Sequence, residues 1–289
     1  MASCARAGRL VPSWHGQPIA LTGKRFVTAL GWITLAMVAT LGLLWVFQRN
    51  LIYLPTRAAP EPPPGVEEIV VETGDGLDLA AWLVPAEAPR ATVIVFNGNA
   101  GNRSTRLPLG MRLAEEGYTV LLTDYRGYGG NPGSPSEDGL DRDARAALEF
   151  AIDRFPSLPL IYFGESLGAG VAIGLAAHTP PDALILRSPF ASLPDIAAVH
   201  YRWIPASLLL RDEYQNVARI ATMTTPVLVI AGSDDRIVPI DQSRAVYEAA
   251  NGPKSLLVID GARHNDRALL DGKEMTSGIV AFLEQSLGG

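Results

Sequence analysis

A serine, a histidine and two neighbouring aspartates are the residues best suited to chemistry in this chain. Ser166 lies in Gly164-Glu-Ser-Leu-Gly168, a G-x-S-x-G pattern between an apolar run and a helical pattern. In that context the glycines allow a sharp turn that lifts a serine hydroxyl above a sheet. A serine hydroxyl is a poor nucleophile on its own, so this turn predicts that another segment supplies a base.

The same glycines could instead cradle a phosphate. A Walker loop requires G-x-x-x-x-G-K-[ST], and no lysine stands at that position. The dinucleotide pattern G-x-G-x-x-G fails as well, because Gly168 and Gly170 are followed by Gly174, one residue late. The next apolar run ends in Arg187-Ser188, without an acid to bind a ribose hydroxyl. The sequence therefore disfavours nucleotide binding.

Histidine is the most common base for a serine nucleophile, and the chain has four histidines. His15 precedes a long apolar run, His178 ends the helical pattern after the serine and is suited to capping it, and His200 lies in a predicted cap. His264 follows directly on the last apolar run, where a loop can carry an imidazole over the edge of a sheet. We therefore interpret His264 as the base for Ser166.

An imidazole base needs a third group that holds it in one tautomer, commonly an aspartate. The segment AGSDDRIVP places Asp234 and Asp235 together in one loop after an apolar run. Position alone does not distinguish the two. The order serine, aspartate, histidine along the chain is the order found in α/β-hydrolases.

These side chains must be positioned by elements that the hydrophobic pattern predicts. VEEIVVETGDGLDLAAWLVP alternates around Gly74-Asp75-Gly76 and predicts a β-hairpin. Further strands are predicted at 92–96, 119–124, 160–164, 183–188, 226–232 and 255–260, and helices at 105–116, 138–155, 167–178, 241–251 and 273–286. The strand runs are uniformly apolar, which is typical of strands covered on both faces. Alternating strands and helices predict an α/β fold with a mainly parallel, eight-stranded sheet flanked by helices.

A membrane anchor is predicted near the N-terminus. The run from Phe26 to Phe47 has 22 residues and no charge, and at ~1.5 Å per residue it spans ~33 Å, enough for a bilayer core. It is too long for the apolar part of a cleaved secretory signal, so we expect an uncleaved signal anchor. Lys24 and Arg25 favour a cytosolic tail over residues 1–25 and a catalytic domain on the far side, which is periplasmic or extracytoplasmic in a bacterium.

The rest of the chain divides into a spacer and one domain. Residues 48–65 include PTRAAPEPPPG and predict a stiff, extended spacer. The domain covers 66–289, and the segment at about 189–224, broken by prolines, predicts a small helical cap over the carboxyl edge of the sheet. Trp203 and Leu208–Leu210 could line an acyl pocket, touch the membrane or fill a small core in the cap, and we favour the last.

Charge and cysteine content limit the possible partners. Residues 1–59 carry six Lys/Arg and no acid, so residues 60–289 hold 18 Lys/Arg against 30 Asp/Glu, a balance of about −12 that argues against nucleic acid. Cys4 is the only cysteine, which excludes an internal disulfide and a thiolate metal site. Neither a metal nor an organic cofactor is expected.

From residue 66 to 287 the chain resembles the α/β-hydrolase superfamily, and more narrowly its single-pass, bud-emergence-protein-like and serine-aminopeptidase-like branch. The segments that match that branch, in order, are FQRNLIYLPT, FNGNAGN, DYRGYGGNPGSPSEDG, GESLGAG, SPFASL, GSDDRIVP and GARHND. The resemblance implies that Asp235, three residues after Gly232, is the triad acid. It also implies an oxyanion hole made by the backbone N–H groups of Asn99 and Leu167. Asn97 stands where the family usually has a histidine.

The resemblance and the residues together lead to one expected activity and two alternatives. The first is a membrane-tethered serine hydrolase that cleaves acyl esters or thioesters of small or lipid-derived substrates, with the bilayer as partner of the N-terminal helix. The second is a serine peptidase or aminopeptidase that uses the same triad. The third is a non-catalytic membrane scaffold, which the presence of Ser166, Asp235 and His264 disfavours.

Overall fold

Eight apolar segments pair into one sheet in the computed structural model, which describes residues 23–288. The strand order is β10-β9-β8-β7-β4-β6-β3-β2. The strands are β2 Glu67–Glu72, β3 Asp78–Val84, β4 Ala91–Phe96, β6 Tyr118–Leu122, β7 Leu160–Glu165, β8 Ala183–Arg187, β9 Val227–Gly232 and β10 Lys254–Ile259. Strands β2 and β3 form the predicted antiparallel hairpin, and from β6 to β10 every pairing is parallel. The predicted mainly parallel, eight-stranded sheet is confirmed.

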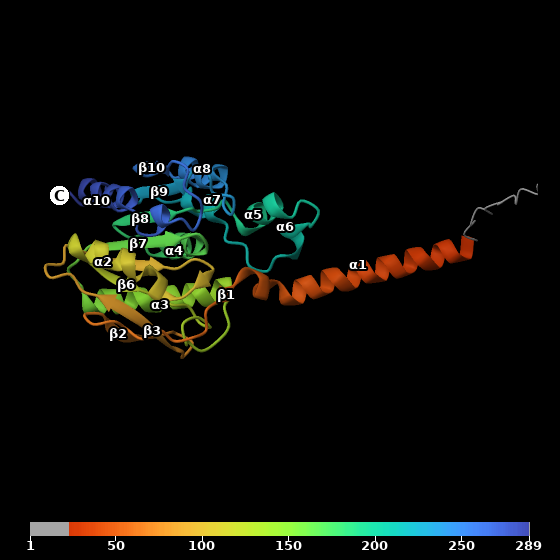
Figure 1. The fold of residues 1–289 in the computed structure, drawn as a ribbon, viewed down its shortest axis with the longest axis horizontal. Helices are drawn as coiled ribbons and strands as arrows, with labels where there is room; N and C mark the ends of the chain where they lie inside the picture. The colour runs from red at the N-terminus through yellow and green to blue at the C-terminus, as the bar shows by residue number, and fades with distance from the viewer. Residues whose placement is uncertain (1–22, 289) are drawn as a thin grey trace, which may run out of the picture. The chain divides into compact units, whose positions relative to one another are not determined.

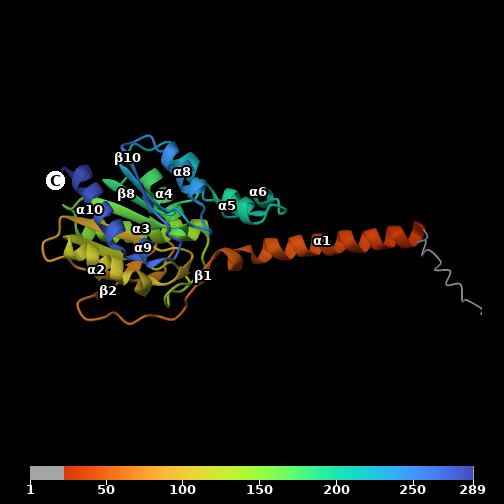
Figure 2. The same ribbon diagram turned by 45° about the horizontal axis from the view of Figure 1, so that its top comes forward.

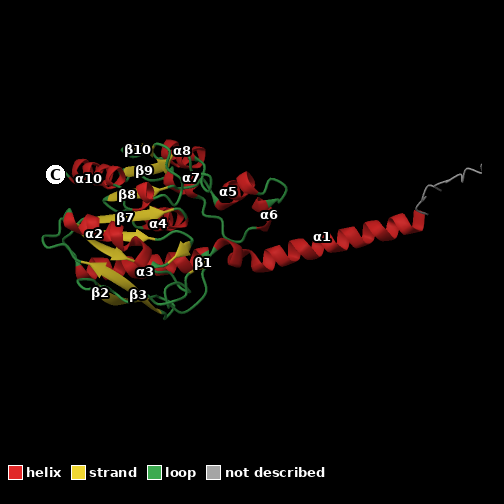
Figure 3. Cartoon of the chain, in the orientation of Figure 1, coloured by secondary structure: helices red, strands yellow, loops and turns green. Residues whose placement is uncertain are grey.

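Helices cover both faces of this sheet (Figures 1 and 3), which explains why the strands β4, β6, β8 and β9 are largely apolar and are buried along their whole length. Along β4, Ile94 and Phe96 point into one buried cluster, and Val93 and Val95 point into a second cluster on the other face. The helices α3 Glu137–Arg154, α4 Leu167–His178 and α8 Ile240–Ala249 contribute to the first cluster. The helices α2 Leu107–Glu115, α9 Arg267–Leu270 and α10 Lys273–Leu287 contribute to the second.

The helix α1, Gly23–Ile52, contains the predicted anchor. Its stretch Arg25–Ile52 is long and apolar enough to cross a membrane, and most of its large apolar side chains are exposed. The chain divides between Val46 and Phe47 into two compact units. The predicted cytosolic tail, with Cys4 and His15, lies outside the described residues apart from its last residues, 23–25.

The structure differs from the sequence-based expectation for the spacer. Residues 48–52 complete α1, and Tyr53 is buried in the core of the larger unit. The strand β1, Leu54–Pro55, then pairs in parallel with β5, Ala100–Gly101. The expectation of a stiff, extended spacer from residue 48 is wrong for this first part, because residues 48–52 are helical and a buried tyrosine and backbone pairing attach residues 53–55 to the domain.

The segment predicted as a cap contains three short helices, α5 Leu193–His200, α6 Ala206–Leu209 and α7 Asn216–Ile220. Figure 2 shows α5 and α6 standing clear of the helices that cover the sheet. Trp203 is 98% exposed and Leu208 is 82% exposed. The expectation that these two side chains fill a core of the cap is therefore wrong, because the loop and helix that carry them have only Ala206 buried nearby.

Candidate active site

Ser166 forms the turn between strand β7 and helix α4. Its backbone has φ 52° and ψ −113°, a conformation that non-glycine residues rarely adopt and that costs about 1–3 kcal/mol where it occurs. The Ser166 N–H donates a 2.8 Å hydrogen bond to the carbonyl oxygen of Arg187, the last residue of the neighbouring strand β8. The surrounding structure thus holds this serine in a strained turn at the carboxyl edge of the sheet, as in a nucleophile elbow.

The two glycines of the G-x-S-x-G pattern are required by close backbone packing. A Cβ at Gly168 would lie 2.1 Å from the carbonyl oxygen of Phe96, and one at Gly164 would lie 2.4 Å from the carbonyl oxygen of Gly168. Any larger residue would push α4 away from β4 or from its own strand. The glycines therefore allow the turn and the close approach of α4 to the sheet.

Asp235 and His264 are buried together, each in a loop after its own strand. His264 Nδ1 lies 2.6 Å from Asp235 Oδ2. The other carboxylate oxygen, Oδ1, accepts hydrogen bonds from the backbone N–H groups of Ile237 and Val238 at 2.9 and 2.8 Å. With Nδ1 donating its hydrogen to the carboxylate, Nε2 of His264 is left as the acceptor that a general base requires.

The environment of Asp235 keeps this carboxyl group ionised. Burial acts to raise its pKa, but the hydrogen bond and charge of His264, together with the N–H groups of Val238 and Ile237, outweigh burial and lower the pKa below its ordinary value. Asp234, by contrast, is exposed, and its backbone N–H donates to Ala262. Of the two aspartates that the sequence leaves open, Asp235 is the one in contact with His264.

A buried arginine connects the serine turn with the histidine loop. The backbone carbonyl oxygen of Arg187 accepts a hydrogen bond from the Ser166 N–H. Its side-chain Nη1 donates to the backbone carbonyl oxygen of His264 at 2.7 Å. Its guanidinium also forms an ion pair with Glu165, and Glu165 pairs in turn with Arg106. Burial acts to raise the pKa of Glu165, but the two arginines outweigh it and hold the pKa below its ordinary value.

Arg187 and Arg106 are site residues that the sequence analysis missed. A single arginine at the end of an apolar strand has no spacing pattern of its own. One signal was present, because an arginine in an otherwise apolar run must find an acid when it is buried. The acid is Glu165, the residue between Gly164 and Ser166 in the serine turn.

The backbone N–H groups expected to form an oxyanion hole lie on the two segments that flank the turn. Leu167 is the first residue of α4, where helix N–H groups have no partner within the helix. Asn99 is fixed from two sides, since its side chain donates to Ile52 at 3.0 Å and its carbonyl oxygen accepts from the Tyr128 hydroxyl at 2.8 Å. Within residues 23–288, neither N–H donates a hydrogen bond.

Comparison with known proteins places this geometry in a family. The family model described as serine aminopeptidase, S33, matches residues 87–211 and 198–266. An uncharacterized protein of Mycobacterium tuberculosis is 48% identical over 263 residues, which cover 88% of this chain and 93% of that protein. The chain belongs to the serine aminopeptidase S33 family.

Two further comparisons concern relatives with informative names. The lysophosphatidylserine lipase ABHD12 of Danio rerio is 35% identical over 190 residues, which cover 59% of this chain and 50% of the lipase. The solved structure of the Pyrococcus furiosus esterase Pf2001 superimposes with a TM-score of 0.68 at 22% identity, covering 82% of this chain and 98% of the esterase. The second likeness shows that this S33 family member has the α/β-hydrolase fold.

Asn97, which replaces a histidine expected in this position, braces the loop that carries Asn99. Its Nδ2 donates to the carbonyl oxygen of Thr123 at 2.7 Å and to Asp124 Oδ1 at 3.2 Å. The backbone carbonyl oxygen of Asn97 accepts from the Tyr125 hydroxyl at 2.7 Å. The amide of Asn97 therefore acts as a hydrogen-bonding group that ties this loop to the end of β6.

The segment Asp124-Tyr-Arg126 holds the neighbouring loops through separate ion pairs. Asp124 Oδ2 lies 2.8 Å from Arg103 Nη1, and both side chains are buried. Arg126 pairs with Asp143 on α3 at 2.7 Å and with Asp75 of the hairpin at 2.8 Å. These ion pairs brace the segment through partners on three other parts of the chain, Arg103, Asp143 and Asp75.

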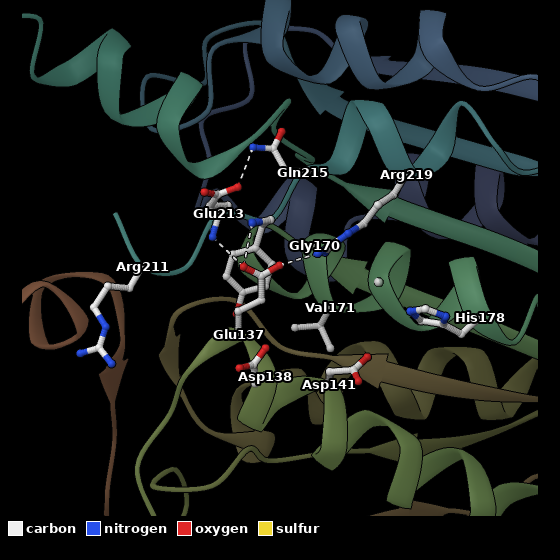
Figure 4. A pocket seen from close by; sticks show the side chains of 12 residues that line it. Glu137, Asp138, Asp141, Gly170, Val171, His178, Arg211, Glu213, Gln215 and Arg219 are labelled. Atoms are coloured by element: carbon white, nitrogen blue, oxygen red, sulfur yellow. Dashed lines mark hydrogen bonds and ion pairs between the residues drawn. The ribbon is translucent and has the colours of Figure 1, made fainter. Parts of the chain in front are cut away.

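A cavity of about 330 Å³ lies beside α3 and α4, and none of the three triad candidates lines it (Figure 4). Its central carboxylate, Glu137, accepts hydrogen bonds from the backbone N–H groups of Glu213 and Tyr214 at 2.6 and 3.0 Å and pairs with Arg219 at 2.8 Å. This carboxylate anchors the return segment of the cap to α3. His178 also lines the cavity, as the last residue of α4.

His200 joins the cap to the loop of the acid. Its Nε2 lies 2.8 Å from the carbonyl oxygen of Ile237, two residues after Asp235. The side chain is exposed, as expected from its place in the cap. Among residues 23–288, no group of three or more His, Cys, Asp or Glu side chains is arranged to hold a metal ion.

Proposed function

We propose that the chain is a membrane-tethered serine hydrolase that cleaves acyl esters or thioesters through an acyl-serine intermediate. The observation that carries this proposal is the buried Asp235–His264 pair, joined through Arg187 to the strained turn of Ser166. This S33 family member shares its fold with esterases. A scaffold without activity would not require an ionised Asp235 held against an imidazole.

In the proposed mechanism, His264 Nε2 removes the hydroxyl proton of Ser166 while Oγ attacks the acyl carbon. The N–H groups of Asn99 and Leu167 hold the oxyanion, and each such donor contributes about 3–4 kcal/mol in comparable sites. The imidazolium, stabilised by Asp235, then gives its proton to the leaving alkoxide or thiolate. Water activated by His264 attacks the acyl-serine and releases the acid.

Two observations support a lipid-derived substrate and a membrane tether. The helix α1 is apolar enough to cross a bilayer, and the relative from Danio rerio is named a lysophosphatidylserine lipase. A tether keeps the active site within reach of acyl substrates in the membrane. The resemblance of the sequence motifs to the single-pass, bud-emergence-protein-like branch also supports this proposal.

A peptidase is the second candidate, because the family description names an aminopeptidase. An aminopeptidase needs an acidic group to bind the substrate amine. The two buried carboxylates beside the serine turn and the histidine already have cationic or imidazole partners, since Glu165 pairs with two arginines and Asp235 with His264. We therefore favour the ester or thioester hydrolase.

A substrate panel tests this proposal. Detergent-solubilised protein is assayed with p-nitrophenyl esters of rising chain length, an acyl thioester and an amino-acid anilide. We expect hydrolysis of the esters or the thioester, and its loss in Ser166→Ala. Ser207→Ala, which changes an exposed serine of the cap, is the matched control and should retain activity. Cleavage of the anilide alone would favour the peptidase, and unchanged ester hydrolysis by Ser166→Ala would refute the mechanism.

A further inference from the structure

The cap exposes an unusual set of large apolar side chains between the end of α5 and the end of α6. Trp203 is 98% exposed, Leu208 82%, Tyr201 61% and Val199 44%. We call this stretch, residues 199–208, the cap tip. Single exposed apolar residues are common, but a group of them on one short segment marks an interaction site. Because Trp203 and Leu208 are almost fully exposed, burial of these two side chains contributes little to the stability of the cap.

The cap tip also differs from the rest of the domain in charge. Residues 60–289 carry 30 acidic side chains, but none falls between Asp195 and Asp212. That interval includes Arg202 and Arg211, which are both exposed. An apolar segment with basic and no acidic residues is suited to a surface whose outer layer is anionic and whose inner layer is apolar. The headgroup region of a bilayer with acidic lipids has this character.

Hydrogen bonds attach the cap to Gln48 and Arg49, the first polar residues after the apolar run. Gln48, the residue after Phe47, donates through Nε2 to the carbonyl oxygen of Leu209 at 3.1 Å and accepts at Oε1 from the Arg211 N–H at 2.7 Å. The guanidinium of Arg49 makes two hydrogen bonds, at 3.0 and 2.9 Å, with the buried carboxylate of Asp212. The segment directly after the cap tip is thus tied to Gln48 and Arg49, which follow the apolar run in the chain.

We propose that the cap tip docks on the bilayer that holds the apolar run, with Trp203 and Leu208 at the boundary between headgroups and acyl chains. This inference rests on the proposed membrane tether. Tryptophan favours that boundary because its ring is amphipathic, and Arg202 lies on the same segment to meet acidic headgroups. A second copy of the chain or another protein would not require the segment after the cap tip to be tied to Gln48 and Arg49.

Docking has a consequence for the active site. The last residue of α5, His200, contacts the carbonyl oxygen of Ile237 in the loop of Asp235. The cap tip begins at the same end of α5. A cap tip held in the bilayer surface therefore holds the loop of the triad acid close to lipid, so that an acyl substrate enters from the membrane.

Depth-sensitive fluorescence on the full chain tests the proposal. In a Cys4→Ser background, Ser207→Cys in the cap tip and Ser157→Cys in the exposed loop between α3 and β7 each carry an environment-sensitive dye. Both proteins are reconstituted in phosphatidylcholine vesicles with or without phosphatidylglycerol, containing a lipid spin-labelled near the top of the acyl chain. We expect roughly threefold or greater quenching at position 207 over position 157, and more with the anionic lipid.

The outcomes separate this inference from the assumptions beneath it. If the protein floats with the vesicles but both dyes are quenched equally, the cap tip does not dock, although the tether stands. A protein that does not float with the vesicles overturns the tether and the docking together. If the wild-type protein hydrolyses no ester in solution while the dye at position 207 is still quenched more than the dye at position 157, only the proposed function is overturned.

A paired substitution provides a second readout. Trp203→Ser with Leu208→Ser changes two side chains that are 98% and 82% exposed, so folding should be retained. We expect about tenfold slower hydrolysis of an acyl substrate embedded in vesicles, with an unchanged rate on a water-soluble ester. Equal rates for the double variant and the wild-type protein on the embedded substrate would contradict the proposal.

Discussion

The carboxylate of Asp235 keeps its charge in a buried place because the groups around it are donors. His264 Nδ1 and the N–H groups of Ile237 and Val238 all point to its two oxygens. These contacts lower its pKa although burial opposes them. An ionised Asp235 can hold the imidazole in one tautomer and stabilise the imidazolium that forms during the reaction.

Replacement of Asp235 tests this role. Asp235→Asn retains the size of the side chain but can donate to Nδ1, which favours the wrong tautomer of His264. We expect kcat/KM for an ester to fall by about 10³- to 10⁴-fold. Asp234→Asn is the matched control in the same loop and should stay near the wild-type value. The assignment is wrong if Asp234→Asn causes the larger loss.

Ser166 and His264 could be predicted from residue patterns, Asp235 only with the help of the family resemblance, and the arginines between them not at all. Ser166 stands in a pattern with a steric cause, and His264 is the one histidine of four that directly follows a predicted strand. Arg187 and Arg106 have no such pattern, because their importance comes from burial beside Glu165. Burial of a single charged residue depends on how distant segments pack, which local spacing does not encode.

Among the elements, the turn between β7 and α4 is the one most constrained by packing. Gly168→Ala would place a methyl group 2.1 Å from the Phe96 carbonyl oxygen, so α4 would have to move. We expect a loss of about 3 kcal/mol in the free energy of unfolding together with loss of activity. Denaturant titration in detergent and an ester assay measure the two effects.

Gly174→Ala is the control on the same helix. A Cβ there meets only Arg219 Nη1 at 3.5 Å, an ordinary contact. Alanine in a helix interior should raise the free energy of unfolding by about 0.5–1 kcal/mol, with activity unchanged. If Gly174→Ala lowers the free energy of unfolding and the activity as much as Gly168→Ala does, the specific role of Gly168 is contradicted.

The ion pairs of Glu165 join three elements, namely η1 (Arg103–Arg106), β7 and β8. Glu165→Gln leaves two buried arginines without a carboxylate, and breaking such a buried pair costs about 3–5 kcal/mol. Glu284→Gln, at an exposed pair with Arg90 3.7 Å apart, should cost less than about 1 kcal/mol. Unfolding in denaturant at pH 7 compares the two variants.

The pH dependence of the same variant follows from the lowered pKa of Glu165. A carboxyl group with a folded-state pKa below its unfolded value of 4.5 contributes stability above that pH and loses it as pH falls. The difference in unfolding free energy between wild type and Glu165→Gln should therefore narrow as pH falls below 4.5. A constant difference across this range would mean that Glu165 is not ionised in the folded protein.

The central strands were largely predictable because their apolar runs are continuous and buried on both faces, and the helices were predictable because they alternate with these strands along the chain. The attachment of residues 48–59 to the domain could not be predicted from the sequence. It depends on Tyr53 entering the core and on β1 pairing with β5, some 46 residues away in sequence. A proline-rich segment gives no local signal for such distant contacts, so the sequence alone suggests a free spacer.

For the whole molecule, the distribution of charge predicts the orientation of the membrane anchor. Lys24 and Arg25 directly precede the apolar run, with Arg6 and Arg9 further back, against Arg49 and Arg57 after it. In sealed, right-side-out vesicles, an impermeant maleimide should label Ser157→Cys in a Cys4→Ser background. The wild-type protein, with Cys4 on the opposite side, should be labelled only after lysis. The reverse pattern would place the catalytic domain in the cytosol.

The central claim, that Ser166 is an activated nucleophile in a membrane-tethered hydrolase, is tested most directly by a fluorophosphonate probe. Such a probe forms a stable adduct only with a serine that a neighbouring base activates. We expect the detergent-solubilised wild-type protein to carry one adduct, located by peptide mass spectrometry on Ser166, and Ser166→Ala to carry none. Equal labelling of Ser166→Ala and the wild type would contradict the account.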